Sequence, residues 1–368
     1  MDMVFVENCC EILDSMRIPI TAADRKKGKY PYYGANGIQD YVSDYIFDDE
    51  LVLLAEDGGN FGSKEKPIAY RVSGKCWVNN HAHVLKPKMG LNVDYLCYSL
   101  MFYKVAGMVN GATRQKLTQA AMRKMQIPYR SMEEQLQIVA ILNKVIKIKE
   151  QRQRGLMLLD ELIKARFVEM FGDPVSATKE EKVELLELCE KITDGEHGSV
   201  ARISEGHPFL NAKHILKNGN IDWDTITFIG ELEHQRIYKR CNPEPGDILL
   251  TTTGTIGNVA IMPECEEVSM DRGITLLKIN HEKVTSEFVA ELLRQDSVQI
   301  EMRANVHASA IGHLFMNKVK KLPAILPAMD RQMEFTKFVA QTDKSKYRQE
   351  KCIGFFQCLE KSIRQEWL

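Results

Sequence analysis

The sequence predicts an α+β protein made of two similar domains, each followed by a long helix. Three observations lead to this prediction: a set of segments that occurs twice in the same order, short β-rich runs separated by Gly, Asn and Pro turns, and two long stretches with helical periodicity. The length agrees, because 368 residues is about twice the common size of a domain.

The internal repeat consists of four pairs of matching segments. Residues 5–15 match 185–195, 51–58 match 248–254, 78–86 match 270–278, and 117–135 match 314–332, with offsets of roughly 180 to 197 residues. Within them Cys9 aligns with Cys189, Asp14 with Asp194, and Gln135 with Gln332. Four matches in one order indicate a duplication, so the two halves are expected to share one fold.

Each half begins with a mixed region of short strands and short helices. Strands are predicted at 51–55, 69–72, 248–252 and 273–279, where β-branched and leucine residues run between turn-forming residues. Short helices are predicted at 93–105 and 285–301. An α+β module therefore precedes each long helix.

The long helices are predicted at residues 133–171 and 330–367. Apolar residues recur every three or four positions, with a polar stretch in the middle of each helix at 147–154 and 342–351. The stripe residues are Ile138, Leu142, Val145, Leu156, Leu159, Ile163 and Met170, then Phe335, Phe338, Thr342, Phe356, Leu359 and Ile363. The helices either pair with each other, antiparallel if a two-fold axis relates the halves, or each covers its own domain. The predicted division is 1–130, 131–172, 173–328 and 329–368.

Composition excludes several classes of protein. The charged fraction of 27% is ordinary for a globular protein, and the net charge of -1 gives no sign of a nucleic-acid binder. Nine scattered cysteines contain no Cys-x-x-Cys pair, which disfavours a zinc ribbon or a disulfide framework. Neither a signal peptide nor an apolar run of membrane-spanning length is present, so a soluble cytoplasmic protein is expected.

Two basic clusters lie just before the long helices. Neither segment contains an acidic residue: residues 111–130 hold Arg114, Lys116, Arg123, Lys124 and Arg130, and residues 303–321 hold Arg303, Lys318, Lys320 and Lys321 with His307 and His313. Local density of this kind suits phosphate neutralisation. The alternative is that each cluster is only a solvent-exposed face near a domain junction. The repetition of the basic cluster in both halves favours nucleic-acid binding.

Turn segments supply candidate base-reading residues. Asn and Gln bond adenine, Arg and Lys favour guanine, and Ser or Thr serve either, although Asn also occurs in turns because it tolerates positive φ. The candidates are Asn36, Asn60, Asn79, Asn80, His81, Arg114 and Gln115 in the first half, and Asn211, Lys213, His214, Thr252, Thr253, Thr255, Asn258 and Arg272 in the second.

Signatures of enzymes are missing from the sequence. It contains no Asn/Asp-Pro-Pro-Tyr/Phe tetrad, no Phe-x-Gly-x-Gly cofactor loop and no phosphate-binding Gly-x-x-x-x-Gly-Lys-Ser/Thr loop. His81 and His83 resemble a pair of metal ligands, but no third ligand lies nearby in the sequence, so a structural role is favoured. We therefore expect no catalytic residues, no metal and no cofactor in this chain.

Several of these segments resemble the specificity (S) subunits of type I restriction-modification systems, over essentially the whole chain. Residues 32–38 (Tyr-Tyr-Gly-Ala-Asn-Gly-Ile), 51–62 and 78–84 are similar to a target-recognition domain of that family. Residues 111–117 (Gly-Ala-Thr-Arg-Gln-Lys-Leu), then Ile127-Pro128 and Glu133-Glu134-Gln135, resemble the junction with the spacer helix. The second half departs from this pattern at 305–311.

The resemblance implies two target-recognition domains separated by two long helices that pack as an antiparallel coiled coil. Each domain would read one half of a bipartite double-stranded DNA target. The helices would set the half-site spacing and dock two methyltransferase (M) subunits, which carry S-adenosylmethionine, with restriction (R) subunits joining afterwards. Outward-facing Ile148, Leu158 and Phe355 are the expected docking residues. The alternatives are a coiled-coil scaffold without DNA specificity, and a specificity subunit of a methylation-only system.

Overall fold

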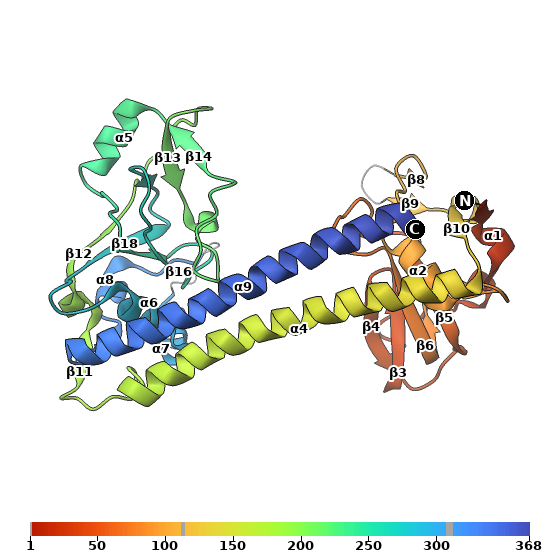
Figure 1. Cartoon of the computed structure of the whole chain (residues 1–368), viewed down its shortest axis with the longest axis horizontal. Coiled ribbons are helices and arrows are strands. Elements are labelled where there is room, and N and C mark those ends of the chain that lie inside the picture. The colour runs from red at the N-terminus through yellow and green to blue at the C-terminus, as the bar shows by residue number, and fades with distance from the viewer. Residues whose placement is uncertain (1, 112–114, 307–311) are drawn as a thin grey trace. The chain divides into compact units, whose positions relative to one another are not determined.

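The computed structural model describes residues 2–111, 115–306 and 312–368. The chain divides into two compact units, Met1–Gln153 with Lys351–Leu368 (unit 1) and Arg154–Glu350 (unit 2). Each unit combines one α+β domain with one half of each long helix (Figure 1). The boundary between the compact units therefore falls inside both long helices, whereas the division predicted from the sequence keeps each helix as a separate segment.

The domain of unit 1 contains ten strands and short helices between them in its described part. The strands are β1 (Asp2–Phe5), β2 (Cys10–Ile12), β3 (Lys27–Gly34), β4 (Gly37–Val42), β5 (Phe47–Ala55), β6 (Ala69–Val78), β7 (Ala82–Pro87), β8 (Val109–Asn110), β9 (Lys116–Leu117) and β10 (Gln126–Tyr129). The helices are α1 (Val6–Cys9), η1 (Asp14–Met16), α2 (Val93–Met101) and α3 (Gln119–Arg123).

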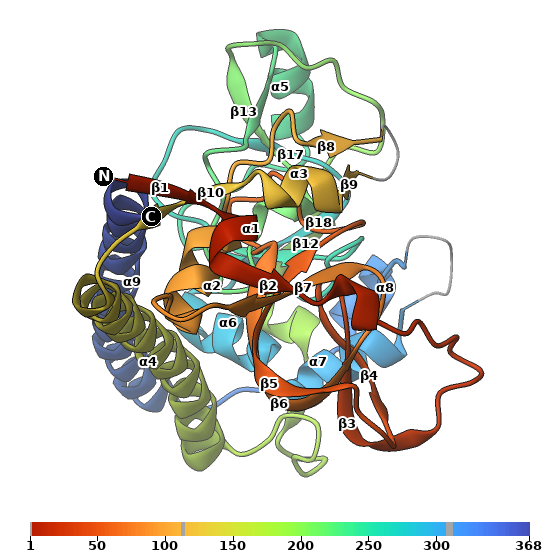
Figure 2. The same cartoon turned by 90° about the vertical axis from the view of Figure 1, so that its right-hand side faces the viewer.

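The main sheet of unit 1 has six strands in the order β2-β7-β5-β6-β3-β4. Its central strand β5 is buried on both faces, because alternate side chains point to opposite sides of a strand. Val52 and Leu54 pack in one apolar cluster with α2, while Leu51 and Leu53 pack in another. The remaining strands form two small pairs, β8 with β9 and β1 with β10; the latter lie side by side near the N-terminus in Figure 2.

Unit 2 contains a domain whose main strands correspond to those of unit 1, although the short helices differ. Its strands are β11 (Lys182–Glu184), β12 (Cys189–Asp194), β13 (His207–Leu210), β14 (Thr227–Ile229), β15 (Ile248–Thr251), β16 (Val259–Ile261), β17 (Ser269–Met270), β18 (Ile274–Ile279) and β19 (Pro323–Ile325). Its helices are η2 (Leu185–Leu188), η3 (Ala212–His214), α5 (Glu231–Tyr238), α6 (Ser286–Arg294), α7 (Asp296–Ala304) and α8 (Met316–Lys320).

The registers of the two sheets confirm the duplication predicted from the sequence. The order β12-β18-β15-β16 in unit 2 matches β2-β7-β5-β6 in unit 1. Leu85 opposes both Ile12 and Val52, just as Leu277 opposes both Ile192 and Ile248. The pair β11–β19 likewise matches β1–β10. The parallel pair Tyr33–Val78 in unit 1 corresponds to the parallel pair Leu210–Met270 in unit 2. The sheet β14-β13-β17 therefore matches the β4-β3-β6 part of unit 1, and unit 2 adds α5 beside it.

Two predicted short helices differ from those in the structure. The helix predicted at 93–105 ends earlier, as α2 (Val93–Met101). The helix predicted at 285–301 is broken at Gln295, which has extended backbone with ψ 138 and separates α6 from α7. The Gln295 amide stabilises the break, because its Nε2 donates 3.1 Å to the carbonyl oxygen of Glu291. Periodicity alone does not reveal such a break, since α7 resumes the apolar pattern.

The two long helices are α4 (Met132–Phe171) and α9 (Met329–Trp367), close to the predicted bounds. In unit 1, Lys149 Nζ lies 2.6 Å from Glu360 Oε2. In unit 2, Arg166 Nη2 lies 3.0 Å from Glu334 Oε1. The beginning of each helix therefore lies beside the end of the other, which makes the pair antiparallel (Figures 1 and 2).

The predicted apolar stripes are the surfaces on which each pair of helix halves packs against its domain. In unit 1, Leu142 and Val145 join the cluster that contains Tyr95 and Leu100 of α2. In unit 2, Phe167 stacks on Phe288 of α6 with ring centroids 5.3 Å apart. Within the described residues, no helix is both long and apolar enough to cross a bilayer.

Candidate nucleic-acid interface

In the first domain, the structure gathers three of the predicted base readers, together with Lys116 of the basic cluster, at the end of β5. Asn36 Nδ2 donates 3.0 Å to the carbonyl oxygen of Gly58, and the Gly58 amide donates 3.3 Å to that of Gln115. His81 Nδ1 lies 2.6 Å from Asp57 Oδ1, and Asp57 forms an antiparallel bridge with Lys116. We call Asn36, Asp57, His81, Gln115 and Lys116 the β5 surface. Asn36, Gln115 and Lys116 are exposed, and Asp57 and His81 are half-buried.

A buried network of charged side chains lies below the β5 surface. Arg17 Nη1 is 2.6 Å from Glu56 Oε2, and Lys116 Nζ is 3.0 Å from Glu56 Oε1. His83 Nδ1 is 2.7 Å from Asp14 Oδ2, and its Nε2 is 2.9 Å from the Leu117 carbonyl oxygen. This network joins β7, the end of β5 and the 115–117 segment, so the backbone at Lys116 is fixed from below.

The pKa directions of the two carboxyls fit a charge-compensated network. Burial opposes ionisation of Asp14, but hydrogen bonds and charge from His83, together with the Val84 amide and Gln119, leave its pKa below the ordinary value. Burial likewise opposes ionisation of Glu56, and hydrogen bonds from Arg17 and Lys116 lower its pKa. Both groups are therefore carboxylates at neutral pH.

The same cluster places two carboxylates beside His83 that sequence spacing could not reveal, whereas His81 lies outside it. Asp14, Glu56 and His83 are a triplet whose ligand atoms lie within 4.8 Å of one another in the described part of the chain. Those atoms already bond each other, Arg17, Lys116 and Gln119 Nε2. Two cationic side chains at the carboxylates disfavour a metal ion, so the triplet fits the structural role expected for His83.

The second domain gathers its candidates at the equivalent place, the end of β15. Thr253 Oγ1 lies 2.7 Å from His313 Nδ1, and Thr255 Oγ1 donates 3.1 Å to the Ala212 carbonyl oxygen. This second set, the β15 surface, comprises Lys213, Thr253, Thr255, Arg272 and His313. Lys213, Thr255 and Arg272 are exposed, and Thr253 and His313 are half-buried.

Backbone hydrogen bonds show that the two surfaces occupy equivalent positions. The Leu117 amide donates 2.7 Å to the Glu56 carbonyl oxygen, and the Leu314 amide donates 2.9 Å to that of Thr252. The bridge of Thr253 with His313 repeats that of Asp57 with Lys116. Burial and the nearby Arg272 charge lower the pKa of His313. At the equivalent bridge position, the β15 surface has the neutral side chain of Thr253 where the β5 surface has the carboxyl group of Asp57.

Two predicted base readers of the second domain are buried and are corrected here. His214 is 0% exposed, with Nδ1 accepting from the Asn211 amide at 3.1 Å and Nε2 3.2 Å from the Thr225 carbonyl oxygen. Thr252 is 1% exposed, and its hydroxyl lies 3.3 Å from that of Thr275. Neither side chain reaches the surface, because each satisfies polar groups inside the domain.

Several asparagines among the candidates support turns. Asn60 Nδ2 donates 3.5 Å to the Pro67 carbonyl oxygen, Asn258 Nδ2 donates 2.8 Å to that of Ile215, and Asn211 Oδ1 caps η3. Asn79 is buried, and its Oδ1 accepts from the His81 amide, whereas Asn80 is exposed. The turn alternative therefore accounts for most of these residues.

The remaining basic candidates lie around α3 and α8. Arg123 ends α3, with Nη1 3.8 Å from Glu7 Oε2, and Lys124 is exposed just after it. On α8, Lys318 is exposed and Lys320 is half-buried. Arg114 and His307 lie outside the described residues.

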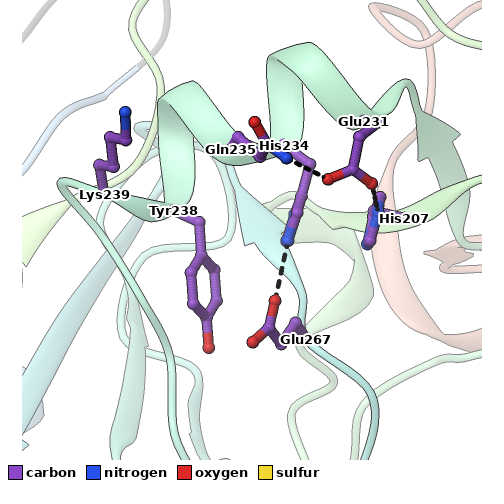
Figure 3. A pocket seen from close by; sticks show the side chains of 7 residues that line it. All are labelled: His207, Glu231, His234, Gln235, Tyr238, Lys239 and Glu267. Carbon is purple, nitrogen blue, oxygen red and sulfur yellow. Dashed lines mark hydrogen bonds and ion pairs between the residues drawn. The ribbon is translucent and has the colours of Figure 1, made fainter.

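A shallow pocket of about 310 Å³ lies beside α5 and the sheet β14-β13-β17 of unit 2 (Figure 3). The rings of His207 and His234 stack with centroids 3.8 Å apart. Their nitrogens already bond neighbours: His207 Nε2 lies 2.6 Å from Glu231, and His234 bonds Ser269 and Glu267. No local pattern in the sequence predicts this pair, because 27 positions separate the two histidines.

The three predicted docking residues lie on the long helices, Ile148 and Leu158 on α4 and Phe355 on α9. Leu158 on α4 is 58% exposed and Phe355 on α9 is 63% exposed, while Ile148 is half-buried. Leu162 and Val168 add further exposed apolar surface on α4 in unit 2. Exposed positions on both long helices therefore carry apolar side chains, although contact with solvent favours polar ones.

The sequence profile of the type I restriction modification DNA specificity domain matches residues 1–156 and 190–352. The chain belongs to this family. Among curated relatives, a putative type I restriction enzyme specificity subunit from Haemophilus influenzae is 28% identical over 344 residues, which covers 89% of this chain and 83% of that protein. A segment of 115 residues is 27% identical to the EcoprrI specificity subunit from Escherichia coli.

Solved structures of this family share the fold. The type I S subunit from M. genitalium matches with a TM-score of 0.57 and 14% identity, over 100% of this chain and 96% of that one. A chain from a structural study of assembly and conformational transition in a type I restriction-modification system matches equally well, over 99% and 96%. These structural matches confirm the predicted two-domain α+β architecture with paired helices, and the profile match confirms the predicted family.

Proposed function

We propose that each domain of this specificity-subunit family member reads one half of a bipartite double-stranded DNA target. The observation that carries the proposal is the equivalent placement of polar and cationic side chains at the ends of β5 and β15. Amide, hydroxyl and guanidinium groups match the donors and acceptors of base edges, while lysines neutralise phosphates. A duplicated reader predicts a target with two halves, which need not be alike, because the two surfaces differ in chemistry.

The proposed base readers are the accessible candidates. In the first domain these are Asn36, Asn60, Asn80, His81 and Gln115, with Arg114 from the sequence pattern. The phosphates of the same half-site are contacted by Lys116, Arg123 and Lys124. In the second domain Asn211, Lys213, Thr253, Thr255, Asn258 and Arg272 read bases, with Lys318 and Lys320 on phosphates. Because most of the asparagines also support turns, the primary readers are those of the β5 and β15 surfaces.

The paired helices are proposed to set the distance between half-sites and to dock two methyltransferase subunits. Exposed apolar side chains on α4 and α9 support this role, since Leu158 and Phe355 lie more than half exposed. Adenine methylation with S-adenosylmethionine would then occur on the partner subunits, and restriction subunits would join afterwards. This chain would select the sequence without a catalytic step, in the cytoplasm.

The decisive experiment is sequencing of methylated adenines in a host that carries this chain with its methyltransferase partner. We expect one bipartite motif that appears only when both are present. Methylation without dependence on this chain would contradict the proposal and favour a scaffold without DNA specificity. Challenge of the same host with unmodified phage, with and without the restriction subunit, separates a restricting system from a methylation-only system.

Docking is tested by combining Ile148→Asn, Leu158→Asn and Phe355→Asn in one chain. We expect co-purification with the methyltransferase to fall at least tenfold while the far-ultraviolet circular dichroism stays that of the unaltered chain. A matched control is Leu232→Asn on α5, a leucine that is 83% exposed and distant in the chain from both long helices. Unchanged co-purification of the triple variant would exclude these residues as the docking site.

A further inference from the structure

A completely buried glutamine lies in the first turn of each long helix. Gln135 on α4 is 0% exposed. Its Oε1 accepts from the Asn92 amide at 2.8 Å, and its Nε2 donates 2.9 Å to the carbonyl oxygens of both Gly90 and Arg130. One side-chain amide therefore joins the start of α4, the turn before α2 and the strand β10 that leads into the helix.

Gln332 on α9 makes the same three bonds in unit 2, and it is also 0% exposed. Its Oε1 accepts from the Thr285 amide at 3.0 Å, while its Nε2 donates 2.9 Å to the Lys283 carbonyl oxygen and 2.8 Å to that of Pro327. The partner residues differ between the units, but every partner atom belongs to the backbone. The geometry is thus duplicated independently of the neighbouring side chains.

The bonding pattern explains why both positions hold glutamine. Two donors and one acceptor are needed on a single planar group, at the end of a side chain long enough to reach from the helix to the turn. A glutamate would offer no donor to the two carbonyl oxygens, and a lysine would offer no acceptor to the amide. A methionine would fill the space but leave three partly buried backbone groups without this partner.

These bonds are directional, unlike the apolar packing that buries one face of each helix against its domain. Tyr98 with Asn143 and Thr285 with Thr336 add single polar contacts between helix and domain. Ile138 and Leu142 on α4, and Phe335 and Val339 on α9, hold each helix against its domain through non-directional packing. A 40-residue helix is about 60 Å long at about 1.5 Å per residue, so a rotation of about 3° at its start moves its far end by about 3 Å. That displacement is close to the rise of one base pair, about 3.4 Å.

We propose that Gln135 and Gln332 are positioning residues that fix the direction of each recognition domain on its own long helix, and thereby the half-site spacing that the protein accepts. The inference rests on the proposed function, because it assumes that the two domains bind separate half-sites. The glutamines touch no DNA. Their effect passes through the rigid junction of β10 with α4 in one unit and of β19 with α9 in the other.

The test measures DNA affinity against spacer length with the full chain in complex with its methyltransferase. The probes are duplexes that carry the half-sites of the wild-type methylation motif, at the native spacing and at spacings one and two base pairs shorter or longer. We expect Gln135→Glu and Gln332→Glu each to reduce the preference for the native spacing over its neighbours at least tenfold. The loss of affinity caused by altering bases within one half-site should stay as in the wild type.

Matched controls are Gln137→Glu and Gln341→Glu, which alter exposed glutamines on the same two helices. They should keep the wild-type spacing profile. If the buried glutamates prevent folding, Gln135→Met and Gln332→Met remove the same bonds without placing a carboxylate against carbonyl oxygens.

A spacing profile of unchanged shape would overturn the inference, whether or not the overall affinity falls, since a purely structural role lowers all affinities together. A wild-type complex without preference for any bipartite duplex would refute the proposed function itself. The two failures are therefore distinguishable.

Discussion

At the scale of single residues, the buried contact between Asp14 and His83 decides how the 115–117 segment is held. The Asp14 side chain is 4% exposed and that of His83 is 0% exposed, so water screens neither group. Val84 and Gln119 also donate to Asp14, at 2.9 Å each. Breaking such a pair leaves a buried charge without its partner, which costs more than the loss of a surface ion pair.

We predict that Asp14→Asn lowers the free energy of unfolding by about 2–3 kcal/mol at pH 7. Because the pKa of Asp14 is lowered in the folded protein, its stabilising effect is complete above the unfolded value of 3.8 and is lost as the pH falls through the lower folded value. The difference between variant and wild type should therefore shrink in acid. Urea unfolding at a series of pH values measures it, with exposed Asp44→Asn as the control. A difference that persists in strong acid would contradict the assignment.

Lys318, which is exposed on α8, gives a second prediction at this scale. Lys318→Gln should weaken binding to all DNA sequences similarly and reduce the slope of log affinity against log salt concentration by about 1, since one phosphate contact is lost. Titrations between low and moderate salt concentrations measure the slope. Lys179→Gln, in the exposed stretch before β11, is the control. A variant that retained the wild-type slope would remove Lys318 from the phosphate contacts.

At the scale of elements, the junction between α6 and the helix pair in unit 2 depends on four phenylalanines. Phe335 is 0% exposed, and its ring lies 5.5 Å edge-on from both Phe167 and Phe171. Phe288 of α6 completes the cluster. Aromatic area buried in this way supplies much of the contact energy between a helix and its domain.

Phe335→Ala should therefore lower the free energy of unfolding by about 3–5 kcal/mol, because it removes a buried ring and leaves a cavity. Phe355→Ala on the same helix should change it by less than about 0.5 kcal/mol, since that ring is 63% exposed. Thermal and urea unfolding compare the two. Equal destabilisation by both would show that burial on α9 does not control stability.

At the scale of the whole molecule, two duplicated domains imply that the halves of the target are read independently. We predict that Gln115→Ala relaxes the sequence preference in one half of the motif and that Arg272→Ala relaxes it in the other half. Each lost base contact should cost about 1–3 kcal/mol of discrimination. Methylation motifs of hosts that carry each variant report the result. Relaxation of both halves by a single variant would contradict separate reading.

The sequence by itself determined the repeat, the α+β class and both long helices. These features follow from local patterns: periodicity of three to four residues marks α4 and α9, and β-branched runs mark β5, β15 and β18. The alignment of Gln135 with Gln332 was also visible, although nothing local showed that both would be buried. The family resemblance followed from the same segments.

Only the tertiary structure decided which candidate residues share a surface. Asn36, His81 and Gln115 meet at the end of β5 because the sheet brings distant segments together, and no spacing in the sequence encodes that contact. Burial was equally invisible: His214 and Thr252 look like polar surface residues in the sequence, yet they satisfy polar groups inside the domain. Periodicity reports which face of one element is apolar, whereas a site depends on which elements become neighbours.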